Sequence, residues 1–165
     1  MRVAIFSDVQ ANLPAMESAV AHIEAWRPDL VVMAGDLVNR GPKSLDCVAL
    51  FDDLRRDQGW LPVQGNHEAW VLRCGREEPR DALEAQTRRF ADWTHEQVRP
   101  RLDSLRGWPD HLCFPGEDDD HWVHVTHGTL TSNREGITAS VPDERLQGKV
   151  PTDVDLFVTA HTHRP

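Results

Sequence analysis

The sequence contains no apolar run that could cross a membrane. A spanning helix needs about 20 consecutive apolar residues, and no stretch of these 165 residues approaches that length. The apolar run at residues 1–6 is too short for a secretory signal peptide and instead predicts a first β-strand. We therefore expect no membrane partner.

Cysteine is scarce as well. Cys47, Cys74 and Cys113 are scattered along the chain, and no two of them form a CxxC pair. An odd, scattered set of cysteines is poor evidence for a disulfide framework. The reducing cytoplasm is the compartment that best fits this usage.

Positive charge is the third shortage. The 18 Lys and Arg residues are outnumbered by 27 Asp and Glu residues, which gives a formal net charge of −9. This balance argues against bulk electrostatic binding to nucleic acid or to an anionic membrane. It does not exclude a phosphate-bearing substrate, because bound metal ions would invert the local field. The length and the ordinary apolar fraction of 39% indicate one globular domain.

Five short polar motifs each follow an apolar run that is typical of a buried strand. The five runs are residues 3–6, 30–34, 61–64, 123–126 and 156–160. The polar residues that follow them are Asp8 and Gln10, then Asp36, Asn39 and Arg40, then Asn66 and His67, then His127, and finally His161 and His163. The carboxyl ends of strands in an open α/β sheet share one edge, where ligands bind. The motifs therefore predict a mixed oxygen and nitrogen site that suits divalent metal ions.

Helical spacing of apolar residues separates the first strands. Helices are predicted at residues 12–26, 44–56, 68–74 and 81–98. The apolar stripe of the last and most polar helix consists of Leu83, Phe90, Trp93 and Val98. Strands alternating with helices predict parallel pairing in the first half, whereas the second half is β-rich, with a further strand at 112–114.

The order of the five motifs resembles that of the calcineurin-like metallophosphoesterase superfamily, over residues 7–163. The resemblance implies an α/β fold with two stacked mixed β-sheets flanked by helices, as an αββα sandwich. It would form a single domain over residues 1–165, with a helical insert at about 76–109. Gln10 stands where the family usually has a metal-binding His, and Ala160 where it usually has Gly.

The family pattern also implies two divalent metal ions, most readily Mn²⁺, with Mg²⁺, Fe or Zn²⁺ as alternatives. One ion would be held by Asp8, Asp36 and His163 with Gln10 in the place of a fourth ligand, and the other by Asn66, His127 and His161 with Asp36 bridging. A metal-bridging hydroxide would attack the phosphorus directly. The amide of Gln10 predicts a weaker first site, biased toward manganese or magnesium. The two histidines of the His-x-His motif alternate along an extended segment, which suits two different metals.

Three residues are implied to act on the substrate rather than on the metals. His67 is the candidate general acid for the leaving oxygen, because imidazole titrates near neutral pH. Arg40 would grip a substrate phosphate, as in the arm of the family that includes protein phosphatases and symmetrical dinucleoside tetraphosphate hydrolases. Asn39 would hold His67 by a hydrogen bond.

The resulting prediction is a cytoplasmic, metal-dependent phosphoesterase that acts on phosphomonoesters or phosphodiesters. Its substrate could be a small molecule, a dinucleoside polyphosphate or a phosphoprotein. The alternative is a non-catalytic binding module with a degenerate metal site, which Gln10 favours. Family members generally continue past the last motif, so we expect the C-terminal closing strands to be absent and the chain to be a fragment. Contacts that select the substrate are expected from residues 81–109 and residues 129–137. The six tryptophans are expected to pack in the core or the cap, with Trp70 the one to check near a substrate.

Overall fold

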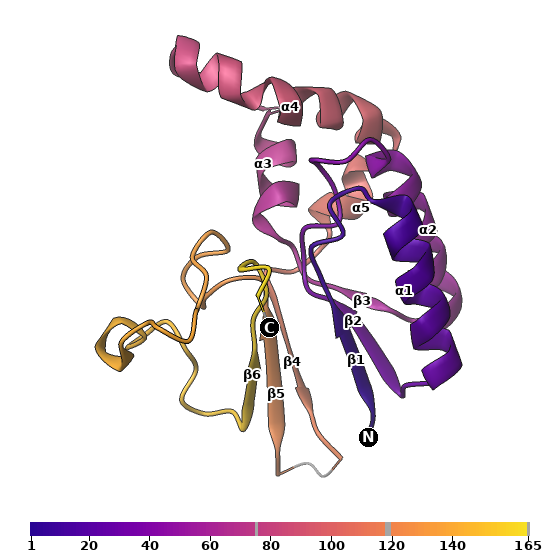
Figure 1. The fold of residues 1–165 in the computed structure, drawn as a ribbon, viewed down its shortest axis with the longest axis vertical. Coiled ribbons are helices and arrows are strands. Elements are labelled where there is room, and N and C mark those ends of the chain that lie inside the picture. Colours follow the sequence, from indigo (N-terminus) through magenta and orange to yellow (C-terminus); the bar gives the residue numbers. More distant parts are fainter. Residues whose placement is uncertain (75, 118–119, 165) are drawn as a thin grey trace.

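The computed structural model describes residues 1–74, 76–117 and 120–164 as two three-stranded β-sheets and a group of helices (Figure 1). The first sheet contains β1 (Val3–Phe6), β2 (Leu30–Met33) and β3 (Leu61–Pro62), in that order. Its strands are all parallel, with Val3 opposite Leu30 and Val32 opposite Leu61. This is the parallel pairing expected when strands alternate with helices.

The helices that connect these strands begin and end where the sequence supplies stop signals. Helix α1 (Leu13–Trp26) begins after Asn12, whose side chain accepts from the Ala15 N–H at 3.2 Å. Helix α2 (Ser44–Gln58) ends at Gly59, which adopts the left-handed conformation typical of a helix terminus. Helix α3 (Asn66–Cys74) starts two residues earlier than the spacing predicts.

The second sheet is mixed and forms the β-rich half. Strand β4 (His111–Pro115) pairs antiparallel with β5 (Trp122–Thr126), and β5 pairs parallel with β6 (Leu156–Val158). The single-turn 3₁₀ helix η2 (Asp143–Arg145) lies in the long connection before β6. Strands β3 and β6 are each two residues shorter than predicted.

Two hydrophobic clusters hold the layers together. One lies between the sheets and joins Val32 and Val63 to Val125. The other lies on the opposite face of the first sheet, where Met16 of α1 and Phe51 of α2 are almost completely buried. These contacts confirm the predicted α/β fold with two stacked sheets. In the part of the chain that the structure describes, all α-helices lie on the side of the first sheet (Figure 1).

Helix α4 (Ala82–Val98) has the predicted bounds, but the face that it buries is not the predicted apolar stripe. Three residues of the predicted apolar stripe are exposed: Leu83 by 70%, Phe90 by 37% and Trp93 by 45%. Its buried residues are Arg88, Ala91, Thr94 and Val98. The polar members of this face satisfy buried groups, since Arg88 donates to the carbonyl oxygen of Cys74 at 2.5 Å and to that of Glu77 at 2.6 Å.

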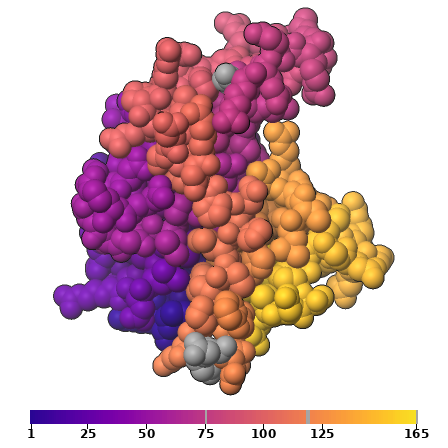
Figure 2. All heavy atoms as spheres, turned by 180° about the vertical axis from the view of Figure 1, so that it is seen from behind, coloured from indigo at the N-terminus to yellow at the C-terminus, as the bar shows by residue number. Residues whose placement is uncertain are grey.

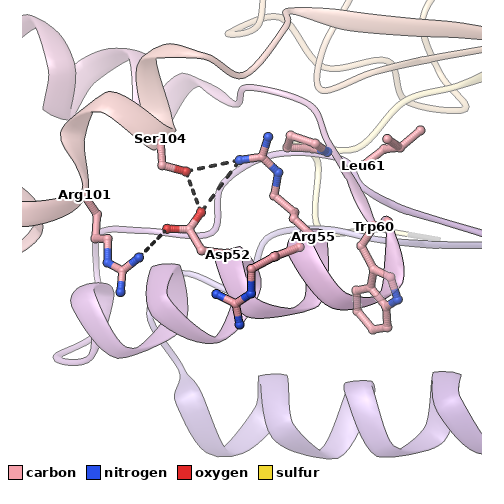
Figure 3. Close-up of a pocket in the computed structure, with 9 residues that line it drawn as sticks. Asp52, Arg55, Trp60, Leu61, Arg101 and Ser104 are labelled. Carbon is pink, nitrogen blue, oxygen red and sulfur yellow. Dashed lines mark hydrogen bonds and ion pairs between the residues drawn. The ribbon is translucent and has the colours of Figure 1, made fainter.

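A polar network fixes the short helices that follow, η1 (Arg99–Arg101) and α5 (Leu102–Arg106), onto α2 (Figure 3). Asp52 accepts from the Ser104 hydroxyl at 2.5 Å and from Arg101 at 3.2 Å, and Arg55 donates to Ser104 at 3.2 Å. The network lines a cavity of about 510 Å³ beside Trp60. Because these groups satisfy one another, we interpret them as a structural tie between the helices.

None of the helices in the described residues combines the length and apolar character needed to span a membrane.

Candidate functional site

The predicted site residues follow the carboxyl ends of the strands, in loops or, for Asn66 and His67, in the first turn of α3, and most have a left-handed backbone. Nine non-glycine residues of the described chain have a positive φ. Seven of them belong to the predicted site: Asp8, Gln10, Asp36, Asn39, Arg40, His161 and His163. Such conformations cost roughly 1–3 kcal/mol each and persist only where the surroundings hold them. They cluster at functional sites for that reason.

The buried carboxylate of Glu68 holds two of these loops together. One of its oxygens accepts from the backbone N–H groups of Asp36 and Gly65, both at 2.8 Å, and the other accepts from Val38 at 3.1 Å. The Asp36 carboxylate in turn accepts a hydrogen bond from the His67 backbone N–H at 2.8 Å. A Cβ atom at Gly65 would lie 2.2 Å from the Asp36 carboxylate, so only glycine fits there. Sequence reasoning missed this role of Glu68, although its place directly after the Asn66-His67 pair was a signal.

His127 is the centre of the first cluster of ligand-type atoms. Its Nδ1 lies 2.8 Å from the carbonyl oxygen of Ala34, which orients the ring as a donor there. Its Nε2 then faces Asp36 Oδ2 at 3.3 Å, Asn66 Oδ1 at 3.1 Å and His161 Nδ1 at 3.2 Å. Protein ligands of metals are commonly oriented in this way, with one ring nitrogen on a carbonyl and the other toward the metal.

A second cluster forms around Asp8 and His163. His163 Nε2 lies 3.0 Å from Asp8 Oδ1 and 3.1 Å from Gln10 Nε2. The other oxygen of Asp8 accepts from the Ser7 hydroxyl at 2.6 Å. Asp8 Oδ1 is buried and accepts no hydrogen bond, because the close contact with His163 lacks the required direction. A buried carboxylate oxygen that has no hydrogen-bond donor is typical of a metal ligand in a metal-free protein.

His161 and His163 do face different clusters, but strand alternation is not the cause. Strand β6 ends at Val158, and both histidines have left-handed φ angles of 69° and 53°. A turn bond from the Thr162 N–H to the Ala160 carbonyl at 2.7 Å shapes the segment between them. Ala160 itself has no positive φ, so the missing glycine costs nothing in backbone strain.

Both clusters offer a donor set that fits divalent metal ions. Asp36, His127 and His161 each place one ligand atom so that the three lie within 4.8 Å of one another. Carboxylate, amide and imidazole ligands together suit manganese, iron or zinc. Asn66 adjoins this first cluster, and Gln10 adjoins the second with its amide nitrogen turned toward His163.

The three residues predicted to act on substrate lie together beside the first cluster. Asn39 Nδ2 lies 2.8 Å from His67 Nδ1, and Arg40 Nε lies 3.1 Å from His67 Nε2. His67 Nε2 is 3.7 Å from Asp36 Oδ2. Thr94 of α4 donates to Asn39 Oδ1 at 2.9 Å, a contact that no sequence motif indicated.

Burial and neighbouring charges shift the pKa values of these groups in different directions. Burial lowers the pKa of His67, and the Arg40 cation adds to this effect against the attraction of Asp36. Burial alone would also lower the pKa of His127, but its hydrogen bond and ion pair with Asp36 raise it. Burial raises the pKa of Glu68 to about 7.

A family model for calcineurin-like phosphoesterases matches the chain over residues 1–165. The chain belongs to the calcineurin-like phosphoesterase family. This confirms the resemblance inferred from the five motifs. Among curated proteins, the serine/threonine-protein phosphatase 1 of Salmonella typhimurium (strain LT2) is 48% identical over 44 residues, which is 27% of this chain and 18% of that protein.

Solved structures of similar proteins include a metallophosphoesterase from Sphaerobacter thermophilus. It is 30% identical with a TM-score of 0.72, and the match covers 100% of this chain and 62% of that one. A candidate diadenosine tetraphosphatase is 25% identical with a TM-score of 0.54, over 87% of this chain and 54% of that one. A hypothetical protein from Pyrococcus horikoshii OT3 shares the fold at 16% identity, with a TM-score of 0.79 over 99% of this chain and 70% of that one. The chain thus spans less than two thirds of the Sphaerobacter and Salmonella relatives.

The three bonds to Glu68 predict that Glu68→Gln destabilises the metal-free protein. The amide has one acceptor oxygen for three N–H donors, and leaving a buried donor unsatisfied costs about 1–3 kcal/mol. Urea unfolding with chelator present measures the loss. The matched control is Glu77→Gln, at a carboxylate whose side chain is 64% exposed, and it should leave the free energy of unfolding unchanged.

The same residue predicts a pH dependence. The folded pKa of about 7 lies above the usual 4.5, so between these values the folded protein keeps a proton that the unfolded chain has lost. The free energy of unfolding therefore falls as the pH rises through this window. Glu68→Gln should flatten that fall, and an unchanged slope would contradict the role of burial at Glu68.

Proposed function

We propose that this chain is a cytoplasmic, metal-dependent phosphoesterase that hydrolyses phosphate esters at the carboxyl edge of its strands. The observation that supports this most is the cluster of Asp36, His127 and His161 ligand atoms, within 4.8 Å of one another, directly beside His67. A metal cluster next to a buried imidazole and an arginine is an arrangement suited to phosphoryl chemistry.

In this proposal two divalent ions bind, most readily Mn²⁺. Asp8, Asp36, His163 and Gln10 would hold one, and Asp36, Asn66, His127 and His161 the other. When bound, such ions activate a water for attack on phosphorus and neutralise the phosphoryl oxygens. The Ala34 carbonyl keeps the Nε2 lone pair of His127 directed at the cluster before any ion arrives.

His67 would carry the proton that the leaving oxygen needs. The Arg40 N–H donates to Nε2 of the ring, and the Asn39 side-chain amide faces Nδ1. Before His67 can donate a proton from Nε2, the hydrogen bond that Arg40 makes to this nitrogen must break. A substrate phosphate that draws the Arg40 guanidinium into a bidentate contact would release it. Phosphate binding and protonation of His67 are coupled in this way.

Asn39 would act as a positioning residue for His67. Its amide is itself held by Thr94 at 2.9 Å, so helix α4 contributes to the orientation of the imidazole. An uncharged amide cannot stabilise an imidazolium as a carboxylate would. Burial lowers the pKa of His67, and the nearby Arg40 cation lowers it further.

The second candidate is a binding module that keeps the fold without catalysis. The observation that favours it is the amide nitrogen of Gln10, 3.1 Å from His163, because nitrogen of this kind is no metal ligand. Such a module would bind phosphate esters without turning them over.

Hydrolysis of p-nitrophenyl phosphate and of bis-p-nitrophenyl phosphate, with Mn²⁺ and with chelator, tests the proposal. Chelator-sensitive release of p-nitrophenol is expected from a folded chain. Phosphate binding without any turnover would favour the binding module instead.

His67→Ala should lower turnover by roughly 10²-fold or more, the usual contribution of a general acid. The ions should remain bound, because His67 lies beside the clusters and not within them. Turnover and bound Mn²⁺ are measured on the same sample, with His22→Ala on the exposed surface of α1 as control. Loss of metal together with turnover would make His67 a ligand or a structural residue.

Gln10→His should tighten the metal site of the second cluster, around Asp8 and His163, because imidazole replaces a neutral amide beside His163. Paired titrations of the two proteins with Zn²⁺ and Mn²⁺ measure the change, which should be larger for Zn²⁺. Equal affinities in both proteins would show that Gln10 does not limit the site.

A further inference from the structure

Thr94 carries a completely buried hydroxyl in the second half of helix α4. The helix lies at the top of the molecule in Figure 2, where its first turns, in pink, project into solvent. Leu83 in those turns lines a cavity of about 540 Å³. Thr94 belongs instead to the part of the helix that packs onto the molecule, with Ala91 and Val98, which are also completely buried. A hydroxyl in such a position needs a hydrogen-bond partner.

The partner of Thr94 lies outside its own helix. A threonine within a helix commonly bonds to a carbonyl oxygen of the preceding turn, as Thr87 does to Glu84 at 3.1 Å. Thr94 donates instead to Asn39 Oδ1 at 2.9 Å, and the two residues are 55 positions apart in the sequence. The hydroxyl hydrogen of Thr94 therefore holds a side chain of the loop after β2.

Asn39 can respond to this bond only with its side chain. Its left-handed backbone, with a φ of 75°, is held by a hydrogen bond from its N–H to the Ser44 hydroxyl at 3.1 Å. One end of its amide meets Thr94, and the other end faces His67 Nδ1 at 2.8 Å. The bond to Thr94 therefore influences which atom of the amide faces the imidazole.

The neutral His67 ring cannot accept hydrogen bonds from both of its neighbours. Arg40 Nε donates to His67 Nε2 at 3.1 Å, while the amide nitrogen of Asn39 faces Nδ1. A neutral imidazole has a hydrogen on one nitrogen and a lone pair on the other, so it accepts at only one of them. Whenever Arg40 bonds to Nε2, the ring hydrogen lies on Nδ1, and the Asn39 amide has to turn its oxygen toward the ring.

A hydroxyl is the group that can serve both orientations of this amide. With the amide nitrogen toward the ring, Thr94 donates to Asn39 Oδ1. With the amide oxygen toward the ring, Thr94 can accept from Nδ2, because a hydroxyl both donates and accepts. Thr94 and Asn39 are both completely buried, so a valine in the place of Thr94 would leave one atom of the amide unpaired in either orientation.

We propose that Thr94 is a positioning residue for the general acid and that it acts through Asn39. Its hydroxyl keeps the Asn39 amide paired while the amide presents its oxygen to the Nδ1–H of His67, and this holds the ring with Nε2 toward the leaving oxygen. The proton passes from Nε2 to that oxygen, and the hydrogen on Nδ1 stays with Asn39. The inference rests on the proposed phosphoesterase function, and it gives helix α4, which carries none of the five motifs, a part in the chemistry.

Two esters that differ only in their leaving group measure the action of the acid. Phenolate depends on a proton more than p-nitrophenolate does, because the nitro group stabilises the negative charge of the leaving oxygen. Thr94→Val should therefore lower kcat for phenyl phosphate roughly tenfold more than kcat for p-nitrophenyl phosphate, both with Mn²⁺. The KM values and the amount of bound Mn²⁺ should not change, because Thr94 acts through Asn39 and His67.

Thr94→Ser keeps the hydroxyl and should restore the ratio of the two kcat values. The matched control is Thr152→Val, at an exposed threonine before β6, which should leave the ratio unchanged. Circular dichroism checks folding, and Thr94→Cys, whose thiol is only a weak donor, takes the place of Thr94→Val if that variant does not fold. Equal losses for both esters, or a serine variant that restores nothing, would make Thr94 a packing residue and overturn the inference.

The ring nitrogens of His67 give a second test that needs no turnover. In isotope-labelled, metal-free protein at one pH, the NMR signals of these nitrogens are those that His67→Ala removes. Thr94→Val should shift the Nδ1 signal, and Thr94→Ser should return it. If neither ester is hydrolysed, the proposed function fails and this measurement decides about Thr94: a shifted signal supports its positioning role, and an unchanged signal overturns it.

Discussion

The hydrogen bonds of the Glu68 carboxylate are the constraint on which the site depends. They tie the loop after β2, through Asp36 and Val38, to the loop after β3, through Gly65. Asp36 is thereby placed between His127 and His67, and it fixes the start of α3 through the His67 N–H. Both the cluster of ligand-type side chains and the candidate acid depend on this one buried group for their positions. Burial and the nearby Asp36 charge raise the pKa of Glu68, whereas the three backbone N–H groups act in the opposite direction.

Much of this arrangement could be predicted because it depends on strand ends. A run of apolar residues followed by Asp or His fixes both the strand and the edge at which the side chain emerges, and the strands β1 and β2 before Asp8 and Asp36 were located correctly. Separation along the chain was no obstacle, since Asp8 and His163 lie 155 positions apart in the sequence and still meet. What the pattern could not supply was the backbone conformation, because left-handed residues leave no periodic trace in a sequence.

Helix α4 shows where pattern reasoning fails for a physical reason. An apolar stripe predicts the buried face only when the surface beneath is apolar. Beneath α4 lie polar groups instead, namely the Asn39 amide and the carbonyls that end α3, so Thr94 and Arg88 turn inward and Phe90 turns outward. The predicted stripe is left in solvent, and Leu83 becomes part of a cavity wall. Through Thr94 and Asn39, the helix contributes to the surroundings of the buried His67 ring.

The left-handed conformation of the site residues couples their side-chain chemistry to backbone strain. Asp, Asn and His tolerate positive φ better than most residues, yet glycine tolerates it without strain. Exchanging Asp8, Gln10 or His163 for glycine would remove a proposed ligand and release backbone strain in the same step. At these positions backbone strain and ligand-type side chains come together, so local stability and site chemistry oppose each other.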